Sequence, residues 1–343
     1  MKILTVIGAR PQFVKAAVFN KQCRLSFVDE RVVHTGQHFD DDLSLNIFNE
    51  LGASPPDKVY RVNRRSRAVM TSEIMELTES EINFFRPDIV NVFGDTDTTF
   101  AAAVAASKLN VKIMHIESGL RSYNRNMPEE VNRVIVDHLS DYLFCPTKTS
   151  VKNLEKEGIK RNVFNVGDIM YDAVRMYKHK FKEPGFILRN NKKTAVMTTH
   201  RAEVLEDPLL QADIIRYCNQ YAKRFNIYFP VHPHTQKKLK EYNISTEHII
   251  CLQPLSYLEM QGLLSLASLV LTDSGGLQKE AYFHDCQCIV LRSETEWPEL
   301  LASGNVKLWK DASKDEDRQI RISDFGQANT AKKILDIMKG QIK

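Results

Sequence analysis

Short apolar runs typical of β-strands alternate with helical patterns along almost the whole chain. In the first half these runs occupy residues 3–7, 32–35, 89–93, 111–116, 142–145 and 163–166. Strands separated by helices of about 10 to 15 residues indicate a parallel sheet with helices on both faces. The alternation therefore predicts an α/β fold before any single motif is considered.

The series starts again after a polar, lysine-rich stretch at residues 178–193. The second set of runs occupies residues 194–199, 227–231, 249–252, 269–271 and 288–291. A chain of 343 residues is also too long for one ordinary core. We therefore predict two Rossmann-like domains facing across a cleft, residues 1–167 and 168–324, with a last helix that could belong to either.

Composition excludes several classes of protein. Lys and Arg number 47 against 43 Asp and Glu, a net charge of +4, which gives no long-range argument for nucleic acid or a membrane surface. No signal peptide is visible, and no run approaches the roughly 18 to 20 apolar residues of a membrane span. The six cysteines are scattered and predict buried, reduced thiols, not disulfides or a metal site. We expect a cytoplasmic protein without a metal.

Polar residues follow nearly every predicted strand. Ligands bind beyond the carboxyl ends of parallel strands, so this pattern predicts a ligand site, although any one residue could be a helix cap or turn residue. In the first half the candidates are Gly8, Arg10, Gln12, Lys15, Gln37, Asp95 and Glu117. In the second half they are His200, Arg201, His232, Asp273, Ser274, Gly275 and Gly276.

The segment Ser274-Gly275-Gly276 opens a helix directly after a strand. Glycines let a ligand approach the backbone, and the first amides of a helix suit a phosphate or pyrophosphate. Glu280, about one turn later, could accept hydrogen bonds from ribose hydroxyls or could simply be solvated. The dinucleotide fingerprint and the P-loop pattern are both absent, which argues against a nicotinamide or flavin cofactor.

Together, the ordered motifs resemble those of the non-hydrolysing UDP-N-acetylglucosamine 2-epimerases, from residue 1 to about residue 305. The matching stretches are Gly8-Ala9-Arg10-Pro11-Gln12, His34-Thr35-Gly36-Gln37-His38, Gly94-Asp95-Thr96, Ile116-Glu117-Ser118-Gly119-Leu120-Arg121, Met127-Pro128-Glu129-Glu130-Val131-Asn132-Arg133, His200-Arg201-Ala202-Glu203, residues 272–281, and Thr295-Glu296-Trp297-Pro298-Glu299.

The resemblance implies a glycosyltransferase-B type of fold, with UDP held mainly by the second domain and the last helix, residues 325–343, packed back on the first. It implies a UDP-sugar substrate and often a homodimer formed through the first domain, for which the Ala-rich helix at residues 100–109 could serve. The implied catalytic residues are Asp95, Glu117, Glu129, Arg133, Lys15 and His200. The implied or candidate substrate-binding residues are Arg10, Gln37, Arg201, His232, Ser274, Gly275, Gly276 and Glu280.

The implied chemistry inverts C2 of the sugar, as in the conversion of UDP-N-acetylglucosamine to UDP-N-acetylmannosamine, which supplies bacterial surface polysaccharides. The C2 hydrogen is not adjacent to a carbonyl, so the family route eliminates UDP to give a glycal and adds it back. This route needs one basic and one protonated carboxyl group on opposite faces of the sugar, and cations and amides for the departing UDP. We assign Asp95 and Glu117 to one face and Glu129 to the other, although the helix dipole alone would favour an acid at Glu129.

Two departures from the family pattern bear on the substrate and on regulation. Trp297 replaces an arginine found in many members and resembles the branch acting on UDP-2,3-diacetamido-2,3-dideoxyglucuronic acid, unless this position only packs. After His38, the acidic segment at residues 39–44 replaces glutamines that serve activation by a second UDP-N-acetylglucosamine. We therefore expect no such activation.

Three other functions remain open. A retaining glycosyltransferase of similar architecture would share the UDP-binding domain but would not need Asp95, Glu117 and Glu129 together. A hydrolysing relative would release UDP and free N-acetylmannosamine. A non-catalytic sugar-nucleotide binding module would keep the phosphate turn without the carboxylates.

Overall fold

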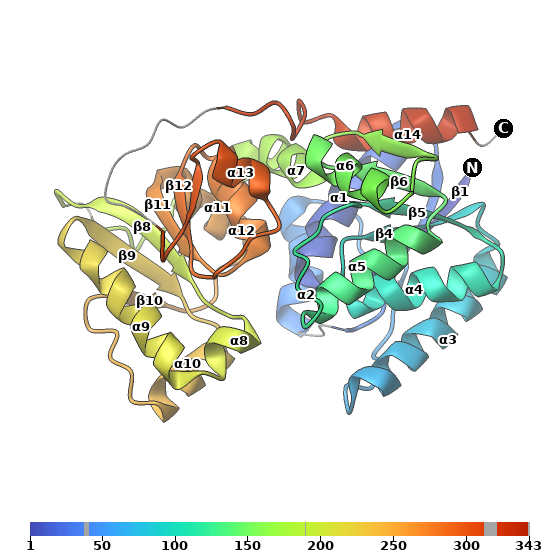
Figure 1. Ribbon diagram of the computed structural model, residues 1–343. Helices are drawn as coiled ribbons and strands as arrows, with labels where there is room; N and C mark the ends of the chain where they lie inside the picture. Colours follow the sequence, from blue (N-terminus) through green and yellow to red (C-terminus); the bar gives the residue numbers. More distant parts are fainter. Residues whose placement is uncertain (38–40, 189, 312–320, 342–343) are drawn as a thin grey trace. The chain divides into compact units, whose positions relative to one another are not determined.

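The chain forms two compact units (Figure 1). The computed structural model describes residues 1–37, 41–188, 190–311 and 321–341, and the side chains of residues 41–45 and 202 are not described. The first unit comprises Met1–Met176 with Ser323–Lys343, and the second comprises Tyr177–Ile322. Each contains one parallel sheet, so the predicted α/β class with two Rossmann-like domains is confirmed.

The first unit contains a seven-stranded sheet in the order β3-β2-β1-β4-β5-β6-β7. Its strands are β1 (Lys2–Ile7), β2 (Asp29–His34), β3 (Lys58–Val59), β4 (Ile89–Phe93), β5 (Lys112–Ile116), β6 (Tyr142–Cys145) and β7 (Val163–Asn165). Its helices are α1 (Arg10–Leu25), α2 (Asp41–Leu51), α3 (Arg67–Phe85), α4 (Asp97–Lys108), α5 (Pro128–Leu139), α6 (Lys148–Lys156), α7 (Ile169–Tyr177) and α14 (Thr330–Gln341).

The order of the first sheet reverses between β1 and β4, the kind of switch point where open α/β sheets bind ligands. Helices α3, α4 and α5 pack together on one face, and α1, α2 and α14 belong to the other (Figure 1). Strands buried on both faces are mostly apolar, and β4 is completely buried. Solubility therefore does not explain why polar residues follow β4 and β5.

The second unit contains a six-stranded sheet in the order β10-β9-β8-β11-β12-β13, with the same reversal after its first strand. Its strands are β8 (Lys193–Thr198), β9 (Phe225–Pro230), β10 (Ile250–Leu252), β11 (Ala267–Thr272), β12 (Gln287–Val290) and β13 (Val306–Leu308). Its helices are α8 (Ala202–Leu205), α9 (Pro208–Asn219), α10 (Pro233–Glu241), α11 (Tyr257–Leu266), α12 (Gly275–Phe283) and α13 (Pro298–Ala302), with the 3-10 helices η1 (Lys178–Lys180) and η2 (Gln220–Lys223).

Helix α14 returns to the first unit, where it packs against α1. The carboxylate of Asp172 in α7 accepts hydrogen bonds from the backbone amides of Thr330 and Ala331, at 3.0 and 2.9 Å. These amides are the first donors of α14, which a helix cannot satisfy by itself. At the other end, Lys339 Nζ donates to the carbonyl of Ser26, 2.8 Å away. Both ends of α14 are thus bound to the first unit.

Three details differ from the sequence expectations. The short edge strands β3 and β13 were not predicted, because each contains a lysine and neither forms an apolar run. The last helix begins at Thr330, five positions after the expected start at residue 325. Cys251 is exposed, so the prediction of six buried thiols is wrong at this position, whereas the other five are buried and all six are free. Within the described part of the chain, no helix is long and apolar enough to cross a membrane.

Candidate active site

Gln12 ties the first strand-to-helix turn to the end of β4. Its side-chain oxygen accepts from the amides of Gly8 and Ala9, at 2.8 and 3.0 Å. Its amide nitrogen donates to the carbonyl of Phe93, 2.8 Å away. The adjacent β1 and β4 are therefore held at a fixed spacing where they end. Arg10, a predicted binding residue, is partly buried at the first position of α1.

Asp95 lies just beyond β4 and is paired with Arg133 of α5. The guanidinium of Arg133 contacts the Asp95 carboxylate and, at 2.8 Å, also that of Glu130. The Asp95 side chain keeps 31% exposure, while that of Arg133 is 5% exposed. Asn132 donates to the backbone carbonyl of Asp95, 3.0 Å away. Asp95 is thus fixed at its backbone and its carboxylate, and remains open to solvent.

Glu117 lies just beyond β5 and pairs with Lys15 of α1. Phe93 and Ile116 are register partners, so the predicted neighbouring positions of Asp95 and Glu117 at adjacent strand ends are confirmed. Glu117 has a φ of 76°, a left-handed conformation that costs energy for a residue with a side chain. Such conformations persist only where the surrounding structure enforces them, and they cluster at functional sites.

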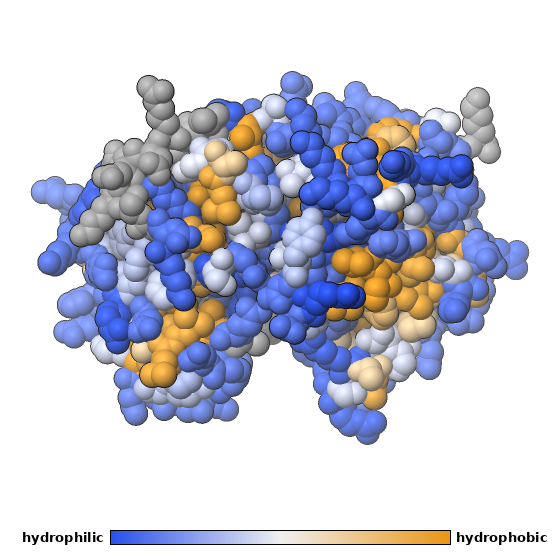
Figure 2. Space-filling model, viewed as in Figure 1, coloured by the Kyte–Doolittle hydropathy of each residue, from blue (hydrophilic) through white to orange (hydrophobic). Residues whose placement is uncertain are grey.

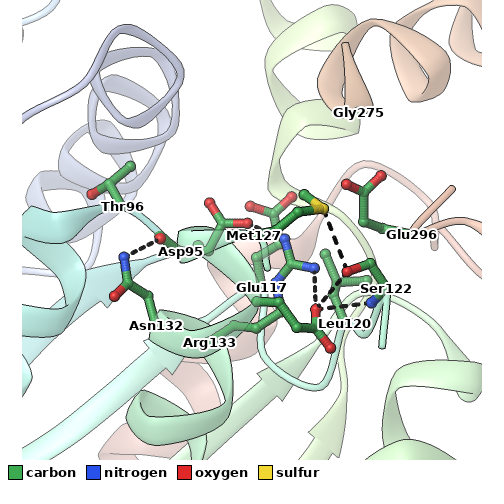
Figure 3. A network of polar contacts seen from close by, with 12 residues as sticks. Asp95, Thr96, Glu117, Leu120, Ser122, Met127, Asn132, Arg133, Gly275 and Glu296 are labelled. Atoms are coloured by element: carbon green, nitrogen blue, oxygen red, sulfur yellow. Dashed lines mark hydrogen bonds and ion pairs between the residues drawn. The ribbon is translucent and has the colours of Figure 1, made fainter. Parts of the chain in front are cut away.

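Gly94 leaves the space in which Glu117 and Lys15 meet. Its φ is 64°, which favours glycine. A Cβ at this position would lie 3.2 Å from Glu117 Oε2 and 3.7 Å from Lys15 Nζ. The side chains of Asp95, Glu117 and Arg133 gather at one place (Figure 3). The first unit thus brings together four of its predicted catalytic residues, namely Asp95, Glu117, Arg133 and Lys15.

Two other predicted residues of the first unit lie differently. Glu129 is partly buried in the first turn of α5, a position that the helix dipole favours for an acid. Gln37 is buried, and its oxygen accepts from Thr98 N and Oγ1, at 2.9 and 2.7 Å. That oxygen therefore helps to hold the start of α4. His38 and the segment at residues 39–44 lie outside the described residues, apart from the backbone of α2 from Asp41 onward.

In the second unit, the predicted phosphate turn forms the start of α12. Ser274 is the N-cap, its Oγ accepting from Leu277 N at 3.4 Å, and Gly275 and Gly276 open the helix. A Cβ at Gly276 would meet only Ser274 Oγ, 3.9 Å away, and its φ is not left-handed. The fold itself therefore does not require glycine at position 276. Close approach of a ligand to the first helix amides would require it.

His200 follows β8 and lies beside the buried Asp273. Asp273 Oδ2 accepts from the amides of His200 and Arg201, at 2.8 and 2.9 Å, and Oδ1 lies 3.1 Å from His200 Nδ1. Desolvation lowers the pKa of His200, but the charge and hydrogen bond of Asp273 outweigh it and raise the pKa above its usual range. The imidazole is about half exposed, at 51%. It can therefore present a positive charge to an anion.

A buried carboxylate next to the phosphate turn is shared by two arginines. Glu296 Oε1 lies 3.1 Å from the guanidinium nitrogens of both Arg201 and Arg292. A Cβ at Gly275 would come within 3.2 Å of Glu296 Oε2, so this carboxylate lies against the turn. Arg292 also lies 3.8 Å from Glu294 Oε1, so two carboxylates, Glu294 and Glu296, accompany the two arginines beside the turn.

Glu280, the predicted ribose ligand, is oriented by a relay of side chains. Gln261 Nε2 donates to Glu280 Oε2 at 3.0 Å, and His284 Nε2 donates to Gln261 Oε1 at 2.8 Å. Desolvation, followed by the charge of Lys178, lowers the pKa of His284 to about 4. The neutral imidazole fixes the Gln261 amide so that its nitrogen points at Glu280.

Trp297 packs within the second unit. It is 2% exposed, and its Nε1 donates to the carbonyl of Gly275, 3.0 Å away. The buried Lys279 places its Nζ 4.5 Å from the centre of the indole ring. Of the two possibilities left open by the sequence, packing is the one the structure shows, and the indole supports the phosphate turn from behind. His232 is the exposed N-cap of α10.

Sequence reasoning missed several residues that hold the first unit's site together. Asp137 and Arg133 lie four positions apart on α5, and this spacing on a helix that begins with catalytic candidates could have pointed to Asp137. His115, between buried apolar residues of β5, was a second available signal. The residues missed are His115, Glu130, Asn132 and Asp137, with Gln261, His284 and Arg292 in the second unit. Among the described residues, no group of three or more His, Cys, Asp or Glu could hold a metal ion.

Comparisons with known proteins identify the family of this chain. The family model for UDP-N-acetylglucosamine 2-epimerase matches residues 21–339. A UDP-2,3-diacetamido-2,3-dideoxy-D-glucuronate 2-epimerase of Pseudomonas aeruginosa is 42% identical over 316 residues, covering 89% of this chain and 87% of the relative. A UDP-N-acetylglucosamine 2-epimerase homolog of Methanococcus maripaludis is 39% identical over 362 residues, covering 99% of both chains.

A solved structure is similar over the whole chain. The UDP-N-acetylglucosamine 2-epimerase of Methanocaldococcus jannaschii, crystallised with UDP-N-acetylglucosamine and UDP, superposes with a TM-score of 0.88 at 31% identity. The match covers 99% of this chain and 100% of that one. Sequence and structure therefore agree that this chain is an isomerase and belongs to the UDP-N-acetylglucosamine 2-epimerase family.

Proposed function

We propose that the protein inverts C2 of a UDP-activated N-acetyl amino sugar without hydrolysing it, with UDP-N-acetylglucosamine and UDP-N-acetylmannosamine as the pair. The observation that carries this proposal is the pair of carboxylates at adjacent strand ends. Asp95 and Glu117 each contact a largely buried cation, Arg133 and Lys15 respectively. A glycosyltransferase or a binding module needs no such pair.

The proposed reaction proceeds by elimination and re-addition. A carboxylate takes the proton from C2, the electron pair forms the C1–C2 double bond, and the bond from C1 to the diphosphate oxygen breaks to release UDP. A carboxylic acid then protonates C2 from the opposite face, and UDP adds back to C1. We assign Asp95 and Glu117 to one face of the sugar and Glu129 to the other, because this chemistry needs an acid and a base on opposite faces.

We assign UDP binding to the second unit. Ser274, Gly275 and Gly276 would bind the diphosphate through the first amides of α12. His200 and Arg201 would add positive charge where negative charge develops on the departing UDP. Glu280 would accept hydrogen bonds from the ribose hydroxyls. Arg10 would contact the nucleotide from the first unit, and Gln37 and His232 remain proposed contacts.

A second substrate is also favoured by an observation. The Pseudomonas aeruginosa relative at 42% identity is named for UDP-2,3-diacetamido-2,3-dideoxy-D-glucuronate. The M. jannaschii structure at 31% identity, in contrast, contains UDP-N-acetylglucosamine. The reaction type is common to both substrates, and only the substituents of the sugar differ.

Initial rates with the two sugars test this proposal. Each UDP-sugar is incubated with the enzyme, and the appearance of its C2 epimer is followed by NMR. Turnover of UDP-N-acetylglucosamine supports the first substrate, and turnover of the diacetamido uronate alone assigns the second. UDP and free sugar, with no epimer from either substrate, would refute the proposed reaction in favour of hydrolysis.

We further propose that the protein is a homodimer through its first unit. All five alanines of α4, a candidate surface, are buried inside that unit, which argues against this helix. The exposed apolar residues Val131 and Ile135 of α5 are better candidates. Figure 2 shows hydrophobic surface in the region of α5. Light scattering should give twice the chain mass for the wild type and the single mass for Ile135→Asp.

The cytoplasm is the compartment we propose for this enzyme. Six free cysteines are typical of a reducing environment, where disulfides do not persist. Cell fractionation followed by immunoblotting tests this location.

A further inference from the structure

We propose that Asp137 is a positioning residue that fixes both carboxylate-bearing turns of the active site, a role that rests on the proposed function of Asp95 and Glu117. Asp137 lies in α5, two turns after Glu129, and its side chain is completely buried. It touches neither Asp95 nor Glu117. Its two oxygens instead contact His115 and the backbone amide of Gly119, which in turn hold the turns that carry Asp95 and Glu117.

The first oxygen acts on the turn of Asp95 through His115. His115 Nδ1 donates to Asp137 Oδ1 at 2.7 Å, and Nε2 donates to the carbonyl of Gly94 at 2.7 Å. Gly94 immediately precedes Asp95, and its φ of 64° marks the turn that directs the Asp95 side chain. A fully buried imidazole thus connects Asp137 to the backbone that carries Asp95.

The second oxygen acts on the turn of Glu117. Asp137 Oδ2 accepts from the backbone amide of Gly119, 3.0 Å away. Glu117 and Gly119 both have a φ of 76°, so this turn contains two left-handed residues. A strained turn keeps its shape only where other contacts enforce it. The bond from Gly119 to Asp137 is one such contact.

The charge of Asp137 is compensated inside the network. Burial by itself raises the pKa of Asp137, but the hydrogen bond and charge of His115, together with Arg121, outweigh burial and hold the pKa below its usual range. Arg121 Nη1 lies 2.7 Å from Asp137 Oδ2, and its Nη2 lies 2.7 Å from Glu157 Oε2. Every partner of the Asp137 carboxylate is therefore a donor.

Helix α5 carries other groups that act on the same turns. Asn132 holds the backbone carbonyl of Asp95, and Arg133 holds its carboxylate. Asp137 lies one turn further along the helix. Of these three residues, it alone acts on both turns, through His115 on that of Asp95 and through Gly119 on that of Glu117. Displacing a reacting group by about 1 Å can cost about 100-fold in rate. The loss of Asp137 should therefore lower kcat without changing how UDP is held.

Three variants separate positioning from charge. Asp137→Ala removes every link, and we expect kcat to fall about 100-fold. Asp137→Asn can keep all of them, since its oxygen still accepts from Gly119 and its nitrogen can donate to a neutral His115, so kcat should stay within about threefold of wild type. His115→Asn keeps a donor toward Asp137 but loses the one toward Gly94, and should lower kcat about 30-fold.

The control is Asp141→Ala. Asp141 Oδ2 accepts from the amide of Ile113 at 2.8 Å, a similar carboxylate-to-backbone bond at the opposite end of β5. This variant should change stability without changing kcat. For all four variants, KM for the UDP-sugar and Kd for UDP should stay within about threefold of wild type. A general structural defect would instead change kcat, KM and Kd together.

Amide hydrogen exchange provides a readout that does not depend on activity. Exchange at Gly119 should accelerate in Asp137→Ala and stay slow in Asp137→Asn. If the wild type exchanges no C2 proton of either UDP-sugar, the proposed function fails, and exchange at Gly119 still decides the positioning role. Unchanged exchange in Asp137→Ala, wild-type kcat in His115→Asn, or equal kcat losses in Asp137→Asn and Asp137→Ala would each overturn the role of Asp137.

Discussion

The two units hold their functional groups in different ways. In the first unit, the carboxylates Asp95 and Glu117 are fixed by buried side chains, among them Arg133 and Lys15. In the second unit, the predicted ligand-binding groups are the first amides of α12 and the half-exposed imidazole of His200. Proton transfer needs groups held at a fixed place, whereas binding a diphosphate needs donors left available. The difference supports our proposal that the first unit carries the chemistry and the second unit binds the nucleotide.

The largest expected effect comes from removing a carboxylate of the first unit. Glu117→Gln and Asp95→Asn should each lower kcat at least several hundred-fold, because general acid–base catalysis by one group contributes about 100- to 10,000-fold. The affinity for UDP should not change, since neither residue belongs to the second unit. Epimer formation followed by NMR gives kcat, and calorimetry gives Kd.

Glu79→Gln is the matched control, an exposed glutamate of α3 in the same unit. It should leave kcat and Kd unchanged. Near wild-type kcat in both carboxylate variants would remove the mechanism, and a large loss of UDP affinity would remove the proposed division between the units.

The next effect concerns the phosphate turn of the second unit. Gly276→Ala should weaken UDP binding about 30-fold, the loss of roughly one charge-assisted hydrogen bond. Thermal stability should stay the same or rise, because the new Cβ meets only Ser274 Oγ at 3.9 Å and alanine favours a helix. Gly185→Ala, with nothing within 4 Å of its Cβ, is the control. UDP affinity equal in both variants would contradict the assignment of the diphosphate to this turn.

The pH dependence of UDP binding should follow His200. Its pKa is raised by Asp273, so the imidazolium persists above the ordinary value of roughly 6.5. UDP affinity should fall about tenfold as the pH rises through the raised pKa. The pair of His200 and Asp273 also stabilises the folded state. This stabilisation is fully present below the pKa of the unfolded-state histidine and is lost as the pH rises through the raised pKa of His200. Calorimetry over a range of about three pH units, from pH 6 to 9, should show this loss of UDP affinity in the wild type. The His200→Asn variant should show no such loss.

The smallest effect concerns the relay behind Glu280. Gln261→Met removes the donor to Glu280 Oε2 with little change in volume. UDP affinity should fall about threefold, because Glu280, the proposed residue that binds the ribose, loses the contact that orients it but keeps its charge. Binding of 2′,3′-dideoxy-UDP should be unaffected, since it lacks both hydroxyls. An equal loss for both nucleotides would show that Gln261 acts on the turn or the base instead.

Most of the fold could be predicted from the sequence, because buried parallel strands are continuous apolar runs. Residues 89–93 and 142–145 match β4 and β6 at both ends. Strands β3 and β13 could not be predicted, since each contains a lysine and forms no apolar run. What makes them strands is pairing with a neighbour, which local sequence does not encode.

The candidate site was only partly predictable. Positions following the strands identified Asp95, Glu117 and His200, because the geometry of a parallel sheet brings such positions to one edge. The residues that support the site from behind, such as Asp137 and Gln261, come from helices, and the direction that a helix side chain faces depends on packing. The same limit applied to Trp297, where only the structure shows that the side chain packs under Gly275.

Deuterium incorporation at C2 tests the central claim most directly. The wild-type enzyme is incubated with UDP-N-acetylglucosamine, and in parallel with the diacetamido uronate, in deuterated water. Proton NMR should show loss of the C2 proton signal in sugar that still carries UDP, in at least one of the two substrates. Free sugar with UDP, or retention of the C2 proton in both substrates, would contradict C2 epimerisation by the carboxylates of the first unit.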